Sequence, residues 1–177
     1  MRLLVSVQCL ALLALLAFGV SHGAQARQDL KLAGLQAPTL VNEVTVRWLG
    51  LRLYKAALFT ESGERFSWSE PMALQLTYLR DFSEPKLTKG TLDELQRIEG
   101  NRSDHTALMA KLSKCFTDVQ AGDRFVAASP RPDTLSMWLN GRKTCTVSEP
   151  NIRKRFLGIW LSDQARSASL SRSLRGQ

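Results

Sequence analysis

The sequence predicts an α+β domain with one antiparallel sheet and helices packed mainly on one face of it. Apolar and polar residues alternate over 39–48 and 72–79, which is typical of half-buried strands. The spacing of apolar residues becomes helical between 83 and 116. Strand-like segments then return on either side of Asn140 and Gly141. Blocks of strands and helices therefore follow one another along the chain.

The first two strands form a predicted β-hairpin. Residues 39–48 and 51–60 contain many strand-forming side chains, and Gly50 marks the turn between them. A polar stretch then predicts a loop, and residues 72–79 predict a third strand.

Two helices are predicted after the third strand. Ser83 and Pro85 mark the start of the first helix, whose apolar stripe ends near Gly100. The second helix covers residues 105–116, and we expect His105 to be exposed near its start.

A further hairpin follows the helices. A short strand over 124–128 precedes strands over 134–139 and 142–147. Asn140 and Gly141 join the last two, because an Asn-Gly pair tolerates the positive φ angles of a tight hairpin turn.

Two helical patterns end the chain. We expect Ser148 to cap the first of them and the basic run 153–155 to form its solvated face. Its predicted buried stripe consists of Ile152, Phe156, Ile159 and Trp160. The second pattern covers residues 162–175.

The first 26 residues resemble a secretory signal peptide. Arg2 precedes an apolar run over 3–20, and Ala24-Gln25-Ala26 is a cleavage site of the A-x-A type. We expect residues 1–26 to be removed and residues 27–177 to form a single domain that is periplasmic or secreted. An uncleaved anchor is the alternative, since the apolar run has about the minimum length that spans a bilayer.

Charge narrows the range of partners. Residues 27–177 contain 23 Lys and Arg against 16 Asp and Glu, a net charge of +7. The positive charge is spread along the chain, so we expect no nucleic-acid partner. Weak contact with an anionic membrane surface is a better match for an exported basic protein.

Cysteine and histidine content excludes several kinds of site. An exported chain meets oxidising conditions, and Cys115 and Cys145 allow a single disulfide; two separately buried thiols are the alternative. These two cysteines and His105 are too few for a zinc site. The chain has no glycine-rich phosphate loop and no dinucleotide fingerprint, so neither a metal nor a cofactor is expected.

Five short motifs, in order, resemble those of bacterial chalcone isomerase-like proteins. They are Val46-Arg47 followed by Leu53-Tyr54-Lys55-Ala56-Ala57-Leu58-Phe59, Leu76 to Leu87, Ala121-Gly122-Asp123, Leu139-Asn140-Gly141, and Phe156-Leu157-Gly158-Ile159-Trp160-Leu161. The resemblance spans about residues 39–176. It implies an open-faced β-sandwich, in which a large antiparallel sheet is covered by a helical layer and a ligand cleft lies between the two.

The resemblance also implies a ligand site. Plant enzymes of this fold close a chalcone to a flavanone, and related proteins bind fatty acids; in both, an Arg on the first hairpin meets the oxygen-rich end of the ligand. Arg47 stands at that position here, and Tyr54 is the candidate for a second polar contact. The enzymes carry a Tyr and an Asn after the third strand, but residues 82–93 contain neither. Most of the polar set of the enzymes is thus absent, and no catalytic residue is assigned.

Three functions remain open. The first is binding of a small amphipathic acid, such as a fatty acid or a flavonoid-like molecule, with Arg47 as a buried guanidinium and Tyr54 as a second donor. The second is an intramolecular lyase (isomerase) activity of the chalcone isomerase type. The third is an envelope interaction module without a ligand. A cavity bordered by Arg47 and Tyr54 would favour binding, whereas one filled by Trp48, Phe116 and Trp160 would favour the module.

Overall fold

The computed structural model describes residues 30, 34–61 and 65–177. The predicted signal peptide lies outside these described residues. No helix within them is long and apolar enough to cross a membrane.

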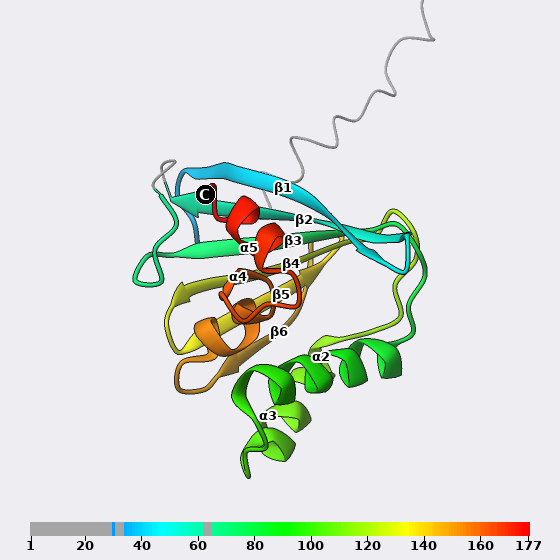
Figure 1. Cartoon of the computed structure of the whole chain (residues 1–177). Coiled ribbons are helices and arrows are strands. Elements are labelled where there is room, and N and C mark those ends of the chain that lie inside the picture. The colour runs from blue at the N-terminus through cyan, green and yellow to red at the C-terminus, as the bar shows by residue number, and fades with distance from the viewer. Residues whose placement is uncertain (1–29, 31–33, 62–64) are drawn as a thin grey trace, which may run out of the picture.

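One antiparallel sheet forms the centre of the molecule (Figure 1). Its six strands are arranged in chain order, so each strand pairs with the next. They are β1 (Pro38–Trp48), β2 (Leu51–Glu61), β3 (Met72–Tyr78), β4 (Arg124–Arg131), β5 (Thr134–Leu139) and β6 (Arg142–Ser148). The predicted strands are therefore all present, and β4 extends three residues beyond its predicted end because it continues to pair with β5 at Arg131.

Among residues 65–177, helical segments occupy two stretches of the chain. Between β3 and β4 lie α2 (Glu84–Glu99), α3 (His105–Leu112) and the 3₁₀ turn η1 (Ser113–Cys115); after β6 come the π-helical segment η2 (Arg153–Leu157), α4 (Gly158–Leu161) and α5 (Ala168–Leu174). Ser83 and Gly100 flank α2 as predicted, although the Asp118 carboxylate accepts from the Glu84 N–H at 2.7 Å and the Ser83 side chain makes no capping bond.

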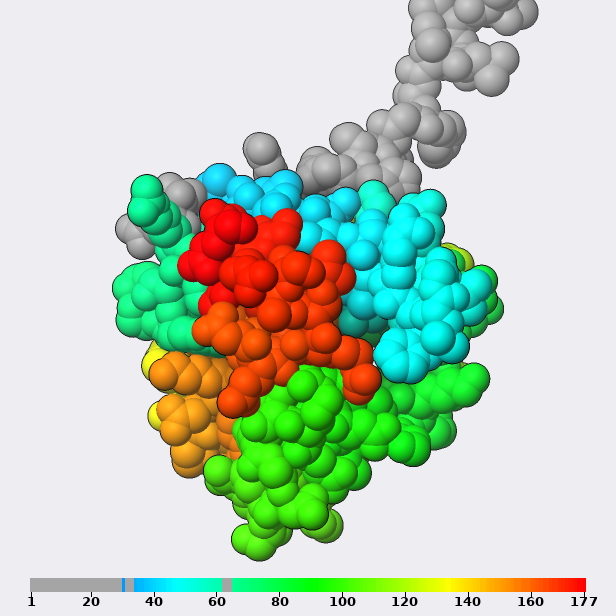
Figure 2. All heavy atoms as spheres, viewed as in Figure 1, coloured from blue at the N-terminus to red at the C-terminus, as the bar shows by residue number. Residues whose placement is uncertain are grey.

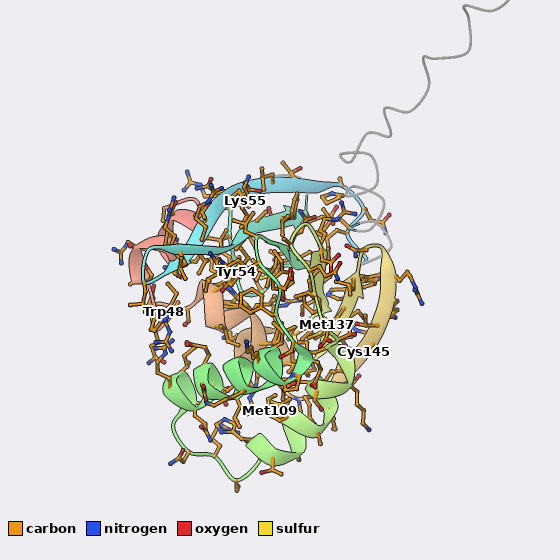
Figure 3. The ribbon with its side chains drawn as sticks, turned by 90° about the vertical axis from the view of Figure 1, so that its right-hand side faces the viewer. Trp48, Tyr54, Lys55, Met109, Met137 and Cys145 are labelled. Atoms are coloured by element: carbon orange, nitrogen blue, oxygen red, sulfur yellow. A yellow bond between two sulfur atoms is a disulfide. The ribbon has the colours of Figure 1, made fainter. Side chains whose placement is uncertain are left out.

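Helices α2, α4 and α5 cover one face of the sheet, and the main core lies between these layers (Figures 1 and 3). Alternate strand residues point to opposite faces. Phe125 and Ala127 of β4 join the helix-side core, whereas Val126 and Ala128 pack on the other face with Leu30. This is the α+β, open-faced arrangement that the sequence predicted.

The last helical region differs from its prediction. Ser148 ends β6 instead of capping a helix, and Asn151 takes a φ of 57°, which delays the helix to Ile152. The carboxylate of Asp133 holds this turn by accepting from the Asn151 N–H at 2.6 Å. The final helix is also shorter than expected, because residues 162–167 form turns before α5 begins at Ala168.

The basic run 153–155 is not the solvated face that we expected. The Arg153 side chain is 1% exposed and donates to the Ser129 hydroxyl, the Ser129 carbonyl and the Trp68 carbonyl. Arg155 donates to both carboxylate oxygens of Glu99 at 2.8 Å. Only Lys154 is exposed, since polar groups on β4 and α2 draw its two neighbours inward.

Candidate functional site

Two adjoining cavities lie between the sheet and the helices. The larger, here called the sheet–helix cavity, has a volume of about 280 Å³; the smaller, here called the α5 cavity, has about 140 Å³. Both are bordered by Val46, Arg47, Tyr54, Glu94, Ile159, Trp160 and Arg166. The two spaces therefore meet at one group of polar and aromatic side chains.

The remaining walls are mostly apolar. The sheet–helix cavity is further lined by Trp48, Leu53, Leu76, Tyr78, Phe82, Lys86, Leu87, Gly90, Thr91, Phe116, Phe125 and Phe156. The α5 cavity is further lined by Val44, Ala165, Ser167, Leu170, Ser171 and Leu174. Trp48, Phe116 and Trp160 thus form walls of an open space and do not fill it.

A β-bulge brings consecutive residues of the first hairpin to the larger cavity. Val46 lies opposite Tyr54 and Arg47 lies opposite Arg52, which leaves Leu53 without a partner on β1. A regular ladder would turn Arg47 away from the face that Val46 occupies, but the extra residue interrupts this alternation. Arg47 and Leu53 can therefore border the same cavity as Val46 and Tyr54.

Tyr54 is the central polar group of the site. Its Oη accepts a hydrogen bond from the Trp160 indole N–H at 3.0 Å, and its ring meets Tyr78 edge-on, with centroids 6.1 Å apart. Burial raises the pKa of Tyr54, so the phenol stays protonated at neutral pH. The Tyr54 O–H has no acceptor among the described residues, which leaves this proton for a molecule in the cavity. Figure 3 shows Tyr54 between the sheet and the helices, with the neighbouring Lys55 on the outer side.

Arg47 borders both cavities from β1. The side chain is exposed, in contrast to the buried guanidinium that we expected, because it lies close to the end of the hairpin. In the part of the chain that the structure describes, its guanidinium has no hydrogen-bond or ion-pair partner. Arg47 is thus a cation at the rim of the cavities.

A polar cluster that the sequence did not reveal completes the rim. Glu94 of α2 accepts from Arg97 and Arg166, and the Arg166 guanidinium lies 5.3 Å from the centre of the Trp48 ring. These contacts join α2, the turn before α5 and the first hairpin. Arg166 lies in a Ser- and Arg-rich tail with no recognisable motif, so its role could not be inferred from the sequence. The helical spacing predicts Trp160 as a core residue, and nothing in the sequence indicates its hydrogen bond to Tyr54.

His105 is buried, and its predicted exposure is wrong. It is 3% exposed, and its Nε2 lies 2.9 Å from Glu99 Oε2. Burial by itself would raise the pKa of Glu99, but hydrogen bonds from Arg155 and His105 lower it overall. The side chain of Asp104 also accepts from Arg102 and Arg155, and these contacts lower its pKa as well. His105 therefore belongs to an ion-pair network and not to the cavities.

The structure contains the predicted disulfide between Cys115 and Cys145, whose Cα atoms are 5.1 Å apart. It connects η1 to β6 and so joins the helical layer to the edge of the sheet. No group of three or more His, Cys, Asp or Glu side chains among residues 30, 34–61 and 65–177 could hold a metal ion.

Comparison with known proteins agrees with this architecture. A family model described as chalcone isomerase-like matches residues 24–176, and the chain belongs to this family. Among solved structures, a fatty-acid binding protein of Arabidopsis thaliana is similar, with a TM-score of 0.62 and 9% sequence identity. The match covers 80% of this chain and 88% of the plant protein, and it shows a shared fold. No curated protein sequence matches. The predicted family and fold are thus confirmed, whereas the predicted bacterial origin stays a prediction.

Proposed function

We propose that this protein binds a small amphipathic acid, such as a fatty acid, in the cavities between the sheet and the helices. The observation that carries the proposal is the unused Tyr54 O–H beside an open, mostly apolar space. An acyl chain would replace water against the apolar walls, and its carboxylate would accept from Tyr54. Similarity to a fatty-acid binding protein supports the same class of ligand.

The charges at the rim suit a carboxylate. Arg47 carries no counter-ion there, whereas the Arg166 charge is already met by Glu94. A ligand carboxylate between Tyr54 and Arg47 would gain one hydrogen bond from a half-buried phenol and an attraction to an exposed cation. Tyr54 is therefore the main anchor in this proposal and Arg47 the weaker one.

Size restricts the ligand. Small-molecule pockets usually measure about 300–1,000 Å³. The sheet–helix cavity, at about 280 Å³, lies just below this range, so a long acyl chain would also need the adjoining α5 cavity. We expect acids of short or medium chain length to fit without movement of α5.

We also propose that the protein acts outside the cytoplasm, after cleavage behind Ala26. The apolar segment 3–20 and the A-x-A site support export. N-terminal sequencing of the protein recovered from the producing cells tests this point. A product that begins at Arg27 would support it, and a retained Met1 would contradict it.

Native mass spectrometry tests the binding proposal. The protein is analysed as purified and after incubation with fatty acids of increasing length, beside Arg47→Ala and the control Arg142→Ala on the distant β5–β6 hairpin. We expect a bound acid in the wild type and the control, with lower occupancy in Arg47→Ala. A wild type that stays empty with every acid would contradict the proposal, and conversion of an added chalcone to a flavanone would support lyase activity instead.

A further inference from the structure

The end of the β1–β2 hairpin exposes an unusual amount of apolar surface. Trp48, Leu49 and Leu51 are 51%, 86% and 48% exposed, and the only other large exposed hydrophobic side chain among the described residues is Leu40. Leu49 and Gly50 form the turn with φ angles of 47° and 79°. A Leu with positive φ at a turn is unfavourable for folding, since Asn or Gly suits that position better. Leu49 is therefore not explained by the fold alone.

The same hairpin end is positively charged. Arg47 and Arg52 lie directly opposite each other on the two strands, and like charges in this arrangement destabilise a sheet. Both are exposed, and neither has an ion-pair partner in the described part of the chain. Residues 44–60 contain no Asp or Glu. An anionic surface would relieve this repulsion.

The hairpin end also borders the sheet–helix cavity. Arg47 and Trp48 line that cavity, together with Lys86 of α2, and the Arg166 guanidinium lies against the Trp48 ring. Figure 2 shows the hairpin end (cyan) on the surface, beside α2 (green) and the C-terminal segment (orange to red). Figure 3 places Trp48 at the edge of the molecule.

We propose that residues 47–52, the hairpin tip, dock on the surface of an anionic lipid bilayer. Leu49 and Leu51 enter the boundary between headgroups and acyl chains, Trp48 lies at the level of the headgroups, and Arg47 and Arg52 contact anionic headgroups. This interaction does not require a ligand in the cavity. It would bring the rim of the sheet–helix cavity to the membrane surface.

A lipid surface suits the tip better than a protein partner does. A specific protein interface buries about 800 Å² on each side, formed by about 20–30 residues. The hairpin tip offers six residues, and its apolar part consists of three. A few inserted apolar side chains and adjacent cations are, by contrast, enough for reversible attachment to an anionic bilayer.

Vesicle co-sedimentation tests the proposal. A chain that begins at Arg27 keeps every residue that the structure describes and removes the apolar segment 3–20, which would bind lipid by itself. The wild type is compared with Leu49→Asn, because Asn tolerates the positive φ of the turn and should preserve the fold. Leu40→Asn is the matched control, since Leu40 is 51% exposed near the start of β1 and far from the tip.

We expect the wild type and Leu40→Asn to bind vesicles of phosphatidylserine and phosphatidylcholine, and Leu49→Asn to bind at least about tenfold more weakly. Arg52→Gln should weaken binding about fivefold, whereas Arg142→Gln on the distant hairpin should have little effect. Binding should fall with added salt and be absent with pure phosphatidylcholine.

Equal binding by Leu49→Asn and Leu40→Asn, or no binding of the wild type to anionic vesicles, would overturn the proposal. Sedimentation also shows whether the chain dimerises. If the wild type is a dimer and Leu49→Asn a monomer, the tip binds a second copy of the chain and not a bilayer, and the proposal is overturned. Fatty-acid occupancy is measured in the same variants and should not change in Leu49→Asn. A failure of vesicle docking is therefore distinguishable from a failure of ligand binding.

Discussion

At the scale of single residues, Tyr54 and Trp160 form the most informative pair in the molecule. The indole N–H of Trp160 occupies a lone pair of the phenol oxygen, and this contact fixes the position of Tyr54 Oη at the meeting point of both cavities. The phenol O–H remains available to donate a hydrogen bond to a ligand. Trp160 therefore positions the group that would hold a ligand.

Replacing Tyr54 by Phe tests that role. The ring and its contact with Tyr78 would be kept, and only the hydroxyl would be lost. A hydrogen bond to a charged group contributes about 1.5–3 kcal/mol, so calorimetric titration should show at least about tenfold weaker binding of a fatty acid. Binding of the corresponding uncharged alcohol should change less. Equal losses for the acid and the alcohol would contradict a carboxylate anchor.

Arg153 is a buried cation that forms no ion pair with a carboxylate among the described residues. It donates to two backbone carbonyls and one hydroxyl, and burial lowers its pKa. Arg153→Ala would leave the Ser129 and Trp68 carbonyls without these donors, so urea unfolding should show a loss of about 3 kcal/mol. Lys154→Ala, one residue further along and exposed, should stay within about 0.5 kcal/mol. Similar losses of stability in the two variants would show that the hydrogen bonds of Arg153 do not stabilise the fold.

At the scale of elements, the end of α2, the start of α3 and η2 are joined by the network around Glu99. Glu99 and Asp104 both have lowered pKa values in the folded protein. A carboxyl group of this kind stabilises the fold above its unfolded pKa and loses that contribution as the pH falls through its folded pKa. The network therefore favours folding at neutral pH and weakens in acid below about pH 4.

The variant Glu99→Gln checks this dependence. We expect it to be less stable than the wild type at pH 7, with the difference shrinking as the pH falls to 3, in urea unfolding measured across that range. Asp93→Asn, which breaks an exposed pair with Lys89 on the same helix, serves as the control and should behave like the wild type. If the free energies of unfolding of Glu99→Gln and the wild type differ by the same amount at every pH, the stabilising effect of Glu99 does not depend on its ionisation.

Local patterns predicted most of these elements but not the details that build the site. The Asn140-Gly141 turn and the Ser83 and Gly100 boundaries of α2 follow from short-range backbone preferences, which a sequence displays directly. The bulge at Leu53 arises from the pairing of two strands, and the burial of His105 and Arg153 arises from partners more than five residues away. Such long-range effects leave no periodic signal in the chain.

At the scale of the whole molecule, an apolar core, hydrogen bonds such as the one between Trp160 and Tyr54, and a disulfide hold the sheet and the helical layer together. The core packs between them, and the Cys115–Cys145 disulfide ties η1 to β6. Neither cysteine lines the two cavities, although Phe116, the residue after Cys115, borders the larger one. The motif order predicted the layers, but the polar rim formed by Glu94 and Arg166 depends on how distant segments meet and could not be predicted.

Removing the disulfide should lower stability while leaving the site in place. The two cysteines are 30 residues apart, and closing a loop of that size contributes about 3–4 kcal/mol in the chain-entropy model. The double variant Cys115→Ala and Cys145→Ser should therefore lose about that amount in urea unfolding, as should the wild type under reducing conditions. Ligand affinity under native conditions should be unchanged. A large loss of affinity in the folded variant would show that the bond also shapes the cavity.

The location of a bound acyl chain decides whether the ligand occupies the cavities between the sheet and the helices. A fatty acid with a photoreactive diazirine at the end of its chain is irradiated with the protein, and the labelled residues are identified by peptide mass spectrometry. We predict labels on buried wall residues of the sheet–helix cavity, such as Leu76 and Phe125, that disappear when unlabelled acid is added. Labels confined to the exposed Leu40, Leu49 or Leu51, or labels that unlabelled acid does not displace, would contradict binding in the cavity.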